Sequence, residues 1–241
     1  MSVNEIVRII PTVKVNNRKL NEKFYIETLG MKPLLEESAF LSLGDQTGTE
    51  RLILEEAPSM RTRRVEGLKK LARLVVKVEN PSEIEGILSQ MKSLPRLFKG
   101  SCGYAFEIVS PEQDVILVHA ENHIEDLVPL DTIPEFYSNK SINHLSQFEV
   151  SVELRLPEDR ESLLDSEFAT NAITFTQGQG PDLTVENNVT WDLSMLKFLV
   201  KNLELTSLRQ KFEGKDYFIP KSEKFFLGKD TNNIELWFEE A

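Results

Sequence analysis

Residues 17–31, NRKLNEKFYIETLGM, constrain the fold more than any other stretch, because they predict a short helix that packs against a sheet. Leu20 and Phe24 are one helical turn apart, and so are Tyr25 and Leu29, which predicts a narrow apolar stripe facing inward. The charged residues between them are expected to face solvent. Such a helix needs a sheet to cover, so strands are expected on both sides of it in the chain.

The same order of elements recurs along the first half of the chain. A strand is predicted at 6–15 before this helix, and three short strands between 34 and 56 after it. A strand at 68–78 then leads into a helix at 81–94, and three more strands follow between 96 and 120. Each unit is one strand, one helix and three strands, which is a βαβββ module.

A polar segment with two prolines separates this half from the next. We therefore expect a two-module N-terminal domain at 1–125, a linker at 126–146 and a degenerate second domain of the same kind at 147–241. The second domain starts with an alternating strand, FEVSVELRL, in a truncated module.

The last module is predicted to hold a strand at 189–193, a helix capped by Ser194 and three closing strands. The helix is predicted because four apolar residues fall on one helical face, namely Leu196, Leu199, Val200 and Leu203. The predicted fold class is therefore α+β, with repeated βαβββ modules.

Charge and composition narrow the class of function. The 241 residues carry a net charge of −11, so nucleic acid is not an expected partner. The apolar runs have the length of strands, so no membrane span is expected. The single cysteine, Cys102, excludes an internal disulfide and fits a reducing compartment, and the first residues lack the basic and apolar regions of a signal peptide. A cytoplasmic location is therefore expected.

Three segments resemble the modules of the vicinal oxygen chelate superfamily, which includes glyoxalase I, bleomycin-resistance proteins and extradiol dioxygenases. FYIETLGM at 24–31 resembles the module signature, and IVSPEQDVIL at 108–117 and LGKDTNNIEL at 227–236 resemble its closing hairpin. The resemblance implies paired modules whose mixed sheets curve around a cavity, with metal ligands on the first and last strands of each module.

As a whole, the chain is similar to the CppA family, whose members carry the name of complement-degrading proteinase. The name implies a host complement protein as the partner and exposure outside the cell. Both are implied by the resemblance, since no spacing in the sequence indicates proteolysis.

The positions of the implied metal ligands hold unsuitable residues. By the family's spacing these positions fall on Ile10 and Arg73, and the closing glutamate of the second module falls on Leu117. None of these side chains is an imidazole or a carboxylate, and in the first module Glu55 or Glu56 alone could bind a divalent ion. Neither a metal nor another cofactor is therefore expected.

Arg73 has two interpretations. Its guanidinium can point into the cavity, where it pairs with Glu55 or holds a small polar or anionic ligand. Alternatively, it belongs to the basic run at 61–73 and faces solvent, and strand alternation leaves both open. The first interpretation predicts a metal-free binding module without catalysis, in which Ile10 and Leu117 are also cavity positions.

A proteinase is the other interpretation, and Cys102 is its only candidate thiol nucleophile. Pairing about a turn centred near Glu112 places Cys102 across from Asn122 and close to His123, with His119 as the second candidate base. A lone cysteine is more often a small buried apolar residue, and a histidine at a strand end is more often structural. The chain has no G-x-S-x-G and no H-E-x-x-H motif.

Aromatic residues are frequent toward the C-terminus. They include Trp191, Trp237, Phe225, Phe226 and Phe238. Packing in the sheet core is the default expectation for them, with a ligand pocket or a homodimer interface as the alternatives.

Overall fold

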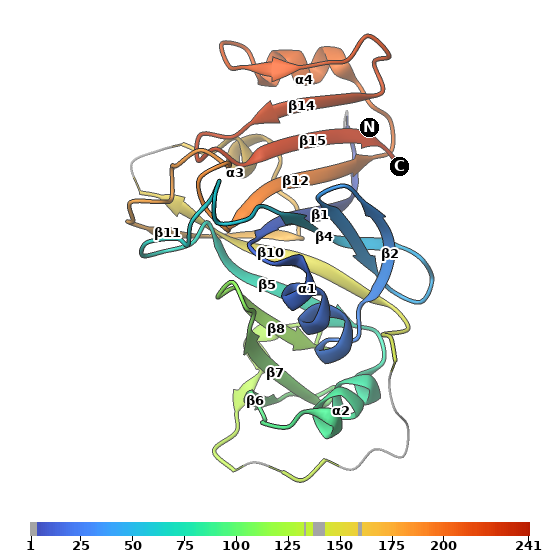
Figure 1. Cartoon of the computed structure of the whole chain (residues 1–241). Coiled ribbons are helices and arrows are strands. Elements are labelled where there is room, and N and C mark those ends of the chain that lie inside the picture. The colour runs from blue at the N-terminus through green and yellow to red at the C-terminus, as the bar shows by residue number, and fades with distance from the viewer. Residues whose placement is uncertain (1–3, 133, 137–142, 159–160) are drawn as a thin grey trace.

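The computed structural model describes residues 4–132, 134–136, 143–158 and 161–241 as a mixed α+β fold built from two sheets (Figure 1). One sheet has eight strands in the order β13-β14-β15-β12-β1-β4-β3-β2, and the other has seven in the order β11-β10-β5-β8-β7-β6-β9. The predicted βαβββ order is confirmed for the first, second and last modules, whereas the third stops after βαβ.

The eight-stranded sheet joins the first module to the last. Its strands are β1 Ile6–Val15, β2 Lys32–Glu37, β3 Phe40–Gly44, β4 Glu50–Glu56, β12 Leu193–Val200, β13 Tyr217–Phe218, β14 Phe225–Lys229 and β15 Glu235–Glu240. The two modules meet where β1 and β12 pair antiparallel, with Ile10 opposite Lys197. Modules that are far apart in the chain therefore share one sheet.

The seven-stranded sheet joins the second module to the third. Its strands are β5 Leu71–Val78, β6 Arg96–Lys99, β7 Tyr104–Val109, β8 Val115–His119, β9 Val128–Pro129, β10 Phe148–Pro157 and β11 Ile173–Gly178. At its centre β5 pairs antiparallel with β10, and Arg73 lies opposite Glu153. The predicted ranges 1–125 and 147–241 thus each contribute strands to both sheets, and their division into separate domains stays a prediction.

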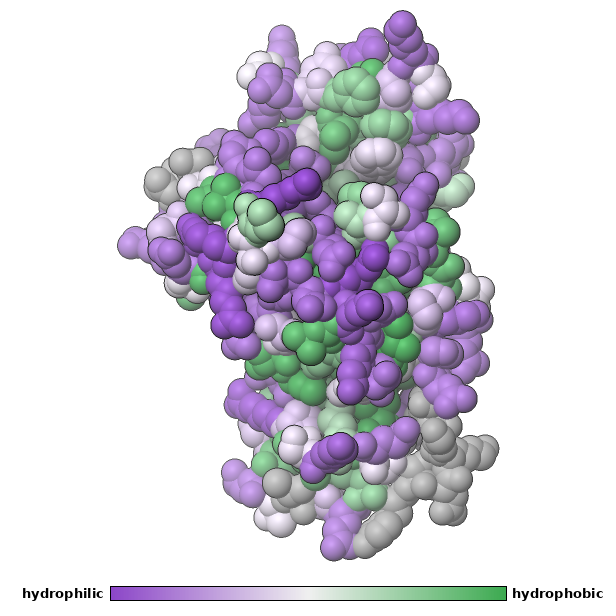
Figure 2. All heavy atoms as spheres, viewed as in Figure 1, coloured by the Kyte–Doolittle hydropathy of each residue, from purple (hydrophilic) through white to green (hydrophobic). Residues whose placement is uncertain are grey.

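Short helices connect the strands. They are α1 Arg18–Glu22, η1 Lys23–Thr28, α2 Pro81–Gln90, η2 Ile124–Asp126, α3 Leu163–Glu167 and α4 Leu205–Lys211. None of the helices among the described residues is long and apolar enough to cross a membrane. The face in Figure 2 is mostly hydrophilic, with hydrophobic residues in small groups.

The first helix begins as predicted and then changes its winding. The side chain of Asn17 caps α1 by accepting a hydrogen bond from the backbone N–H of Leu20 at 3.0 Å. From Lys23 the turns widen into a π-helix, and Tyr25 and Leu29 are buried. The side chain of Leu20 is 54% exposed, so its predicted place in the buried stripe is wrong. The change of winding shifts later residues around the axis relative to Leu20.

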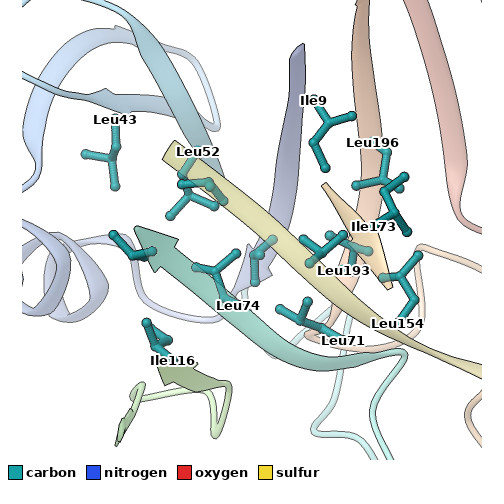
Figure 3. Close-up of a cluster of buried hydrophobic side chains, with 14 of the residues drawn as sticks. Ile9, Leu43, Leu52, Leu71, Leu74, Ile116, Leu154, Ile173, Leu193 and Leu196 are labelled. Atoms are coloured by element: carbon teal, nitrogen blue, oxygen red, sulfur yellow. The ribbon is translucent and has the colours of Figure 1, made fainter. Parts of the chain in front are cut away.

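The two sheets share one hydrophobic core between their backs. Figure 3 shows side chains from both sheets gathered in it, among them Leu52 and Leu196 of the eight-stranded sheet and Leu74 and Leu154 of the seven-stranded sheet. Because successive side chains of a strand point to opposite faces, the neighbours of these leucines project from the outer face of each sheet. A site formed by side chains within the sheets therefore lies on one of two outer faces.

The helix predicted after Ser194 is wrong, because β12 occupies that stretch. Leu196, Phe198 and Val200 are buried at every second position, which is the strand period. The ring of Phe198 stacks on Phe238 of β15 with 4.7 Å between centroids. Pairing with β1 and β15 on both sides satisfies the backbone of β12, so tertiary contacts override the helical spacing of its leucines. The predicted strand at 189–193 overlaps β12 at its last residue alone.

Candidate functional site

The outer faces of the two sheets carry the positions that the resemblance assigns to metal ligands. The chain neighbours of Ile10 and Arg73 belong to the shared core, so these two side chains project outward. On the eight-stranded sheet Ile10 lies beside Lys197, and on the seven-stranded sheet Arg73 lies beside Glu153. Each outer face thus has one such pair at its centre, where the two modules meet.

The guanidinium of Arg73 lies between two carboxylates. It forms an ion pair with Glu153 of β10, and its Nη1 is 3.7 Å from Oε2 of Glu107 on β7. The side chain of Arg73 is 26% exposed, and both glutamates are also largely buried. The Nε–H of Arg73 is buried and has no hydrogen-bond partner among the described residues. The cluster therefore holds a fixed cation with a buried donor that has no acceptor among the described residues.

The sheet beside this cluster is apolar. Leu117 on β8 is buried and lies between Val75 and Glu107 on the neighbouring strands. A small separate core contains Val75, Phe98, Ala105 and Leu117, and Ile124 and Leu127 pack against it. Leu117 is thus covered by the segment that follows β8, and it offers no ligand atom for a metal.

A lysine holds the corresponding place on the eight-stranded sheet. The Nζ of Lys197 lies 2.8 Å from Oε1 of Glu239 and 3.3 Å from Oε2 of Glu50. Burial acts to lower the pKa of Lys197, but its hydrogen bonds and charge interactions with these glutamates outweigh burial and raise the pKa above its usual value. Ile10, next to Lys197, is buried. An internal cation and an apolar side chain fill this position.

Glu55 and Arg73 do not line one cavity. Glu55 is on β4, where its carboxylate lies 3.0 Å from Nζ of Lys14 and accepts a hydrogen bond from the hydroxyl of Ser194 at 3.2 Å. Arg73 projects from the outer face of the other sheet, with the shared core between them. The predicted pairing of Arg73 with Glu55 is therefore wrong, and Glu153 takes that place.

Cys102 lies in an exposed loop and contacts a carboxylate. Its backbone N–H donates to Oε1 of Glu121 at 2.6 Å, and its Sγ is 3.8 Å from Oγ of Ser101. The hydroxyl of Ser101 donates to the other oxygen of Glu121 at 2.6 Å. The backbone N–H beside the thiol is thus already bonded to a carboxylate. In a thiol protease, the oxyanion of the reacting peptide would need free N–H donors at such a place.

The two candidate bases bond elsewhere. His119 is 3% exposed, and its Nδ1 accepts the backbone N–H of Glu121 at 3.1 Å. Burial, aided by the charge of Lys77, lowers the pKa of His119 to about 4. His123 has a side chain that is 71% exposed, with Nδ1 at 3.6 Å from Glu125. Among the described residues neither histidine is hydrogen-bonded to Cys102.

Comparison with known proteins places this geometry in a family. The chain matches the family models described as CppA N-terminal, over residues 8–130, and CppA C-terminal, over residues 145–238. The chain belongs to the CppA family. The crystal structure of cppA protein from Streptococcus pneumoniae TIGR4 is 69% identical over 99% of this chain and 100% of that one, with a TM-score of 0.97. No curated protein matches the chain.

More distant structures share the fold of this CppA-family chain. A putative dioxygenase from Bacillus subtilis subsp. subtilis str. 168 gives a TM-score of 0.61 at 11% identity, covering 99% of this chain and 86% of that one. Glyoxalase I from Zea mays gives 0.54 at 11% identity, covering 98% and 92%. These neighbours support a fold made of vicinal oxygen chelate modules. At 11% identity they say nothing beyond the fold.

The metal that this fold implies does not fit the residues of the CppA-family chain. A divalent ion needs several carboxylate or imidazole ligands at one point. The positions that the resemblance assigns to metal ligands hold Ile10, Arg73 and Leu117. The nearby carboxylates already pair with an internal arginine or lysine. The described residues contain no group of three or more histidine, cysteine, aspartate or glutamate side chains that could hold a metal ion. A positive side chain takes the place that a metal cation would need.

The aromatic residues near the C-terminus divide between the two faces of the sheet. Phe226 and Phe238 lie in the core, as expected, and Trp191 is buried with its Nε1–H donating to the carbonyl of Ala57 at 2.7 Å. Phe225 and Trp237 lie on the other face, half-buried and stacked with 3.8 Å between centroids.

Sequence reasoning missed the cation Lys197 and the partner of Arg73. Lys197 was hidden because its strand was predicted as a helix, which obscured its alternation with buried residues. Glu153 stands in the alternating strand FEVSVELRL, so an outward position was predictable for it. Its place opposite Arg73 was not, because that depends on which strands pair.

Proposed function

We propose that this chain is a binding protein that holds a small polar ligand on the outer face of the seven-stranded sheet. The observation that supports it most is Arg73, which stands at a metal-ligand position of the fold with its Nε–H buried and unpartnered. A buried donor without an acceptor costs about 1–3 kcal/mol, so a ligand that accepts from Nε offsets this cost.

The charges of the cluster select the ligand. Two carboxylates, Glu107 and Glu153, contact the single guanidinium of Arg73. A second cation, Arg96, lies 3.6 Å from Glu107, but its side chain is 63% exposed, so the more buried part of the cluster is negative. A purely anionic ligand would meet repulsion there, whereas an ammonium or amide group can donate to the carboxylates. The ligand we propose therefore carries an acceptor for Nε beside an amino group, as a free amino acid or the N-terminus of a short peptide does.

Calorimetric titration with free amino acids and dipeptides tests the proposal. We expect at least one to bind the wild type, and Arg73→Gln to weaken binding by about tenfold or more, which is ~1.4 kcal/mol. Arg64→Gln is the matched control, because Arg64 is exposed in the loop before β5. Equal binding by Arg73→Gln and the wild type would contradict the proposal, as would the absence of binding across the whole panel.

A proteinase that cleaves a complement component is a second proposal, suggested by the family resemblance. The observation that favours it is the free thiol of Cys102, which is accessible beside Ser101 and Glu121. The test is cleavage of the purified component by the wild type and by Cys102→Ala, each made in a protease-deficient host. Loss of cleavage in the variant would support the thiol mechanism, and no cleavage by either chain would exclude it.

A further inference from the structure

Among the described residues, the third module lacks two of the strands that the other three modules have. In those modules the last strand has an antiparallel neighbour on its outer side, with β3 beside β4, β7 beside β8 and β14 beside β15. The third module ends at β11, which pairs with β10 on one side and forms the end of the seven-stranded sheet. Among the described residues no strand pairs with the other side of β11.

The other sheet edges are protected against pairing, and β11 is not. The edge strand β2 carries Pro33 and two adjacent glutamates, while β9 and β13 are two residues long. In contrast, β11 has six residues, ITFTQG, with no charge and no proline. Long uncharged edge strands attract other strands, and natural proteins normally block them with charges, prolines or short lengths. An unblocked edge therefore indicates a partner strand.

We propose that β11 of a second copy of this chain pairs antiparallel with β11, so that the chain forms a symmetric dimer through this edge. An antiparallel strand fills this place in the other three modules. Two identical strands related by a two-fold axis are self-complementary. The chain carries a net charge of −11, which opposes self-association over most surfaces, but β11 itself is uncharged.

The sequence of β11 also indicates a register. If the two-fold axis passes beside Phe175, this residue lies opposite its own copy and Thr174 lies opposite Thr176 of the second copy. Aromatic pairs and threonine pairs are both favourable across antiparallel strands. Thr174 and Thr176 are exposed, although the hydroxyl of Thr176 donates to the carbonyl of Leu154 at 3.4 Å, and Phe175 is partly buried against the core. All three side chains therefore have some surface left for these contacts. Since β11 has six residues, we expect a weak dimer, with a Kd on the order of 10–100 µM.

Sedimentation equilibrium of the full chain and two double variants tests both the edge and the register. Thr174→Lys/Thr176→Lys places like charges opposite each other, and we expect it to weaken dimerisation at least tenfold. Thr174→Lys/Thr176→Glu places opposite charges across the axis, and we expect it to dimerise at least as well as the wild type. Within one chain, position 174 lies beside Glu153 and position 176 beside Arg155 on β10. The lysine and glutamate of the second variant therefore also face opposite charges inside their own chain.

Leu35→Lys on the exposed edge strand β2 is the control for a general effect of added charge, and thermal melting checks that every variant folds. A wild type that stays monomeric across this concentration range would overturn the proposal and leave the edge to a strand from another protein. A dimer that Thr174→Lys/Thr176→Lys forms as readily as the wild type would place the interface elsewhere.

Discussion

A single buried carboxylate connects the two sheets. Asp192 is fully buried, and it accepts hydrogen bonds from the backbone N–H groups of Lys70 at 2.6 Å, Leu71 at 3.1 Å and Leu193 at 2.8 Å. Leu71 starts β5 and Leu193 starts β12, and these strands belong to different sheets. Burial raises the pKa of Asp192, in opposition to the N–H groups that favour its charged form. Asp192 therefore ties the start of β5 to the start of β12.

His119 is expected to limit stability in acid. Its pKa is lowered to about 4 in the folded chain by burial and by Lys77, against about 6.5 in an unfolded chain. The folded state thus binds the proton less readily, so the stability contributed by neutral His119 is complete above about pH 6.5 and is lost as pH falls toward 4. We expect His119→Gln to flatten this pH dependence of the unfolding free energy by roughly 3 kcal/mol.

Urea unfolding between pH 7 and pH 4 measures the effect of His119→Gln. Glutamine keeps an oxygen that can accept from the backbone N–H of Glu121. His123→Gln is the control, since the side chain of His123 is 71% exposed, and its pH dependence should match the wild type. Equal slopes for His119→Gln and the wild type would show that His119 does not titrate in this range.

At the scale of elements, α4 packs so closely on β14 that one glycine is required. A Cβ built on Gly228 would lie 2.2 Å from the ring of Phe212, which is fully buried at the end of α4. We expect Gly228→Ala to destabilise the fold by about 1–3 kcal/mol, because the ring has no free space to move into. Gly180→Ala is the control, with its nearest neighbour at 3.5 Å, and should change stability by less than about 0.5 kcal/mol. Chemical unfolding measures the free energy of unfolding of both variants. If Gly228→Ala loses no more stability than Gly180→Ala, the contact with Phe212 is unimportant.

The elements differ in how far the sequence predicts them. The helix α2 was predictable because a local cap and apolar spacing determine it. The strand β12 was not, because its leucines also fit a helical face and pairing with two neighbouring strands decides the outcome. For the candidate site, Arg73 could be placed on a strand from the sequence, but its partners depend on contacts between strands distant in the chain.

At the scale of the whole molecule, the chain is interlaced. The first module completes its sheet with the last module, and the second with the third, so each half supplies one side of both central strand pairs. The shared core likewise draws residues from both halves (Figure 3). One family model ends at residue 130 and the other begins at residue 145, yet each sheet contains strands from both sides of this boundary. A boundary in sequence is therefore compatible with a single folding unit.

We accordingly expect neither half to fold alone. A fragment of residues 1–136 would expose the pairing edges of β1 and β5, together with the core side of both sheets, and a fragment of 143–241 would expose the edges of β10 and β12. Burial of apolar surface across the two junctions supplies much of the stability, so each fragment alone should lack a cooperative thermal transition. The two fragments expressed together should copurify and melt as one unit. Cooperative melting of the isolated N-terminal fragment near the temperature of the intact chain would instead establish 1–125 as an independent domain, because the second module would then be stable without β10.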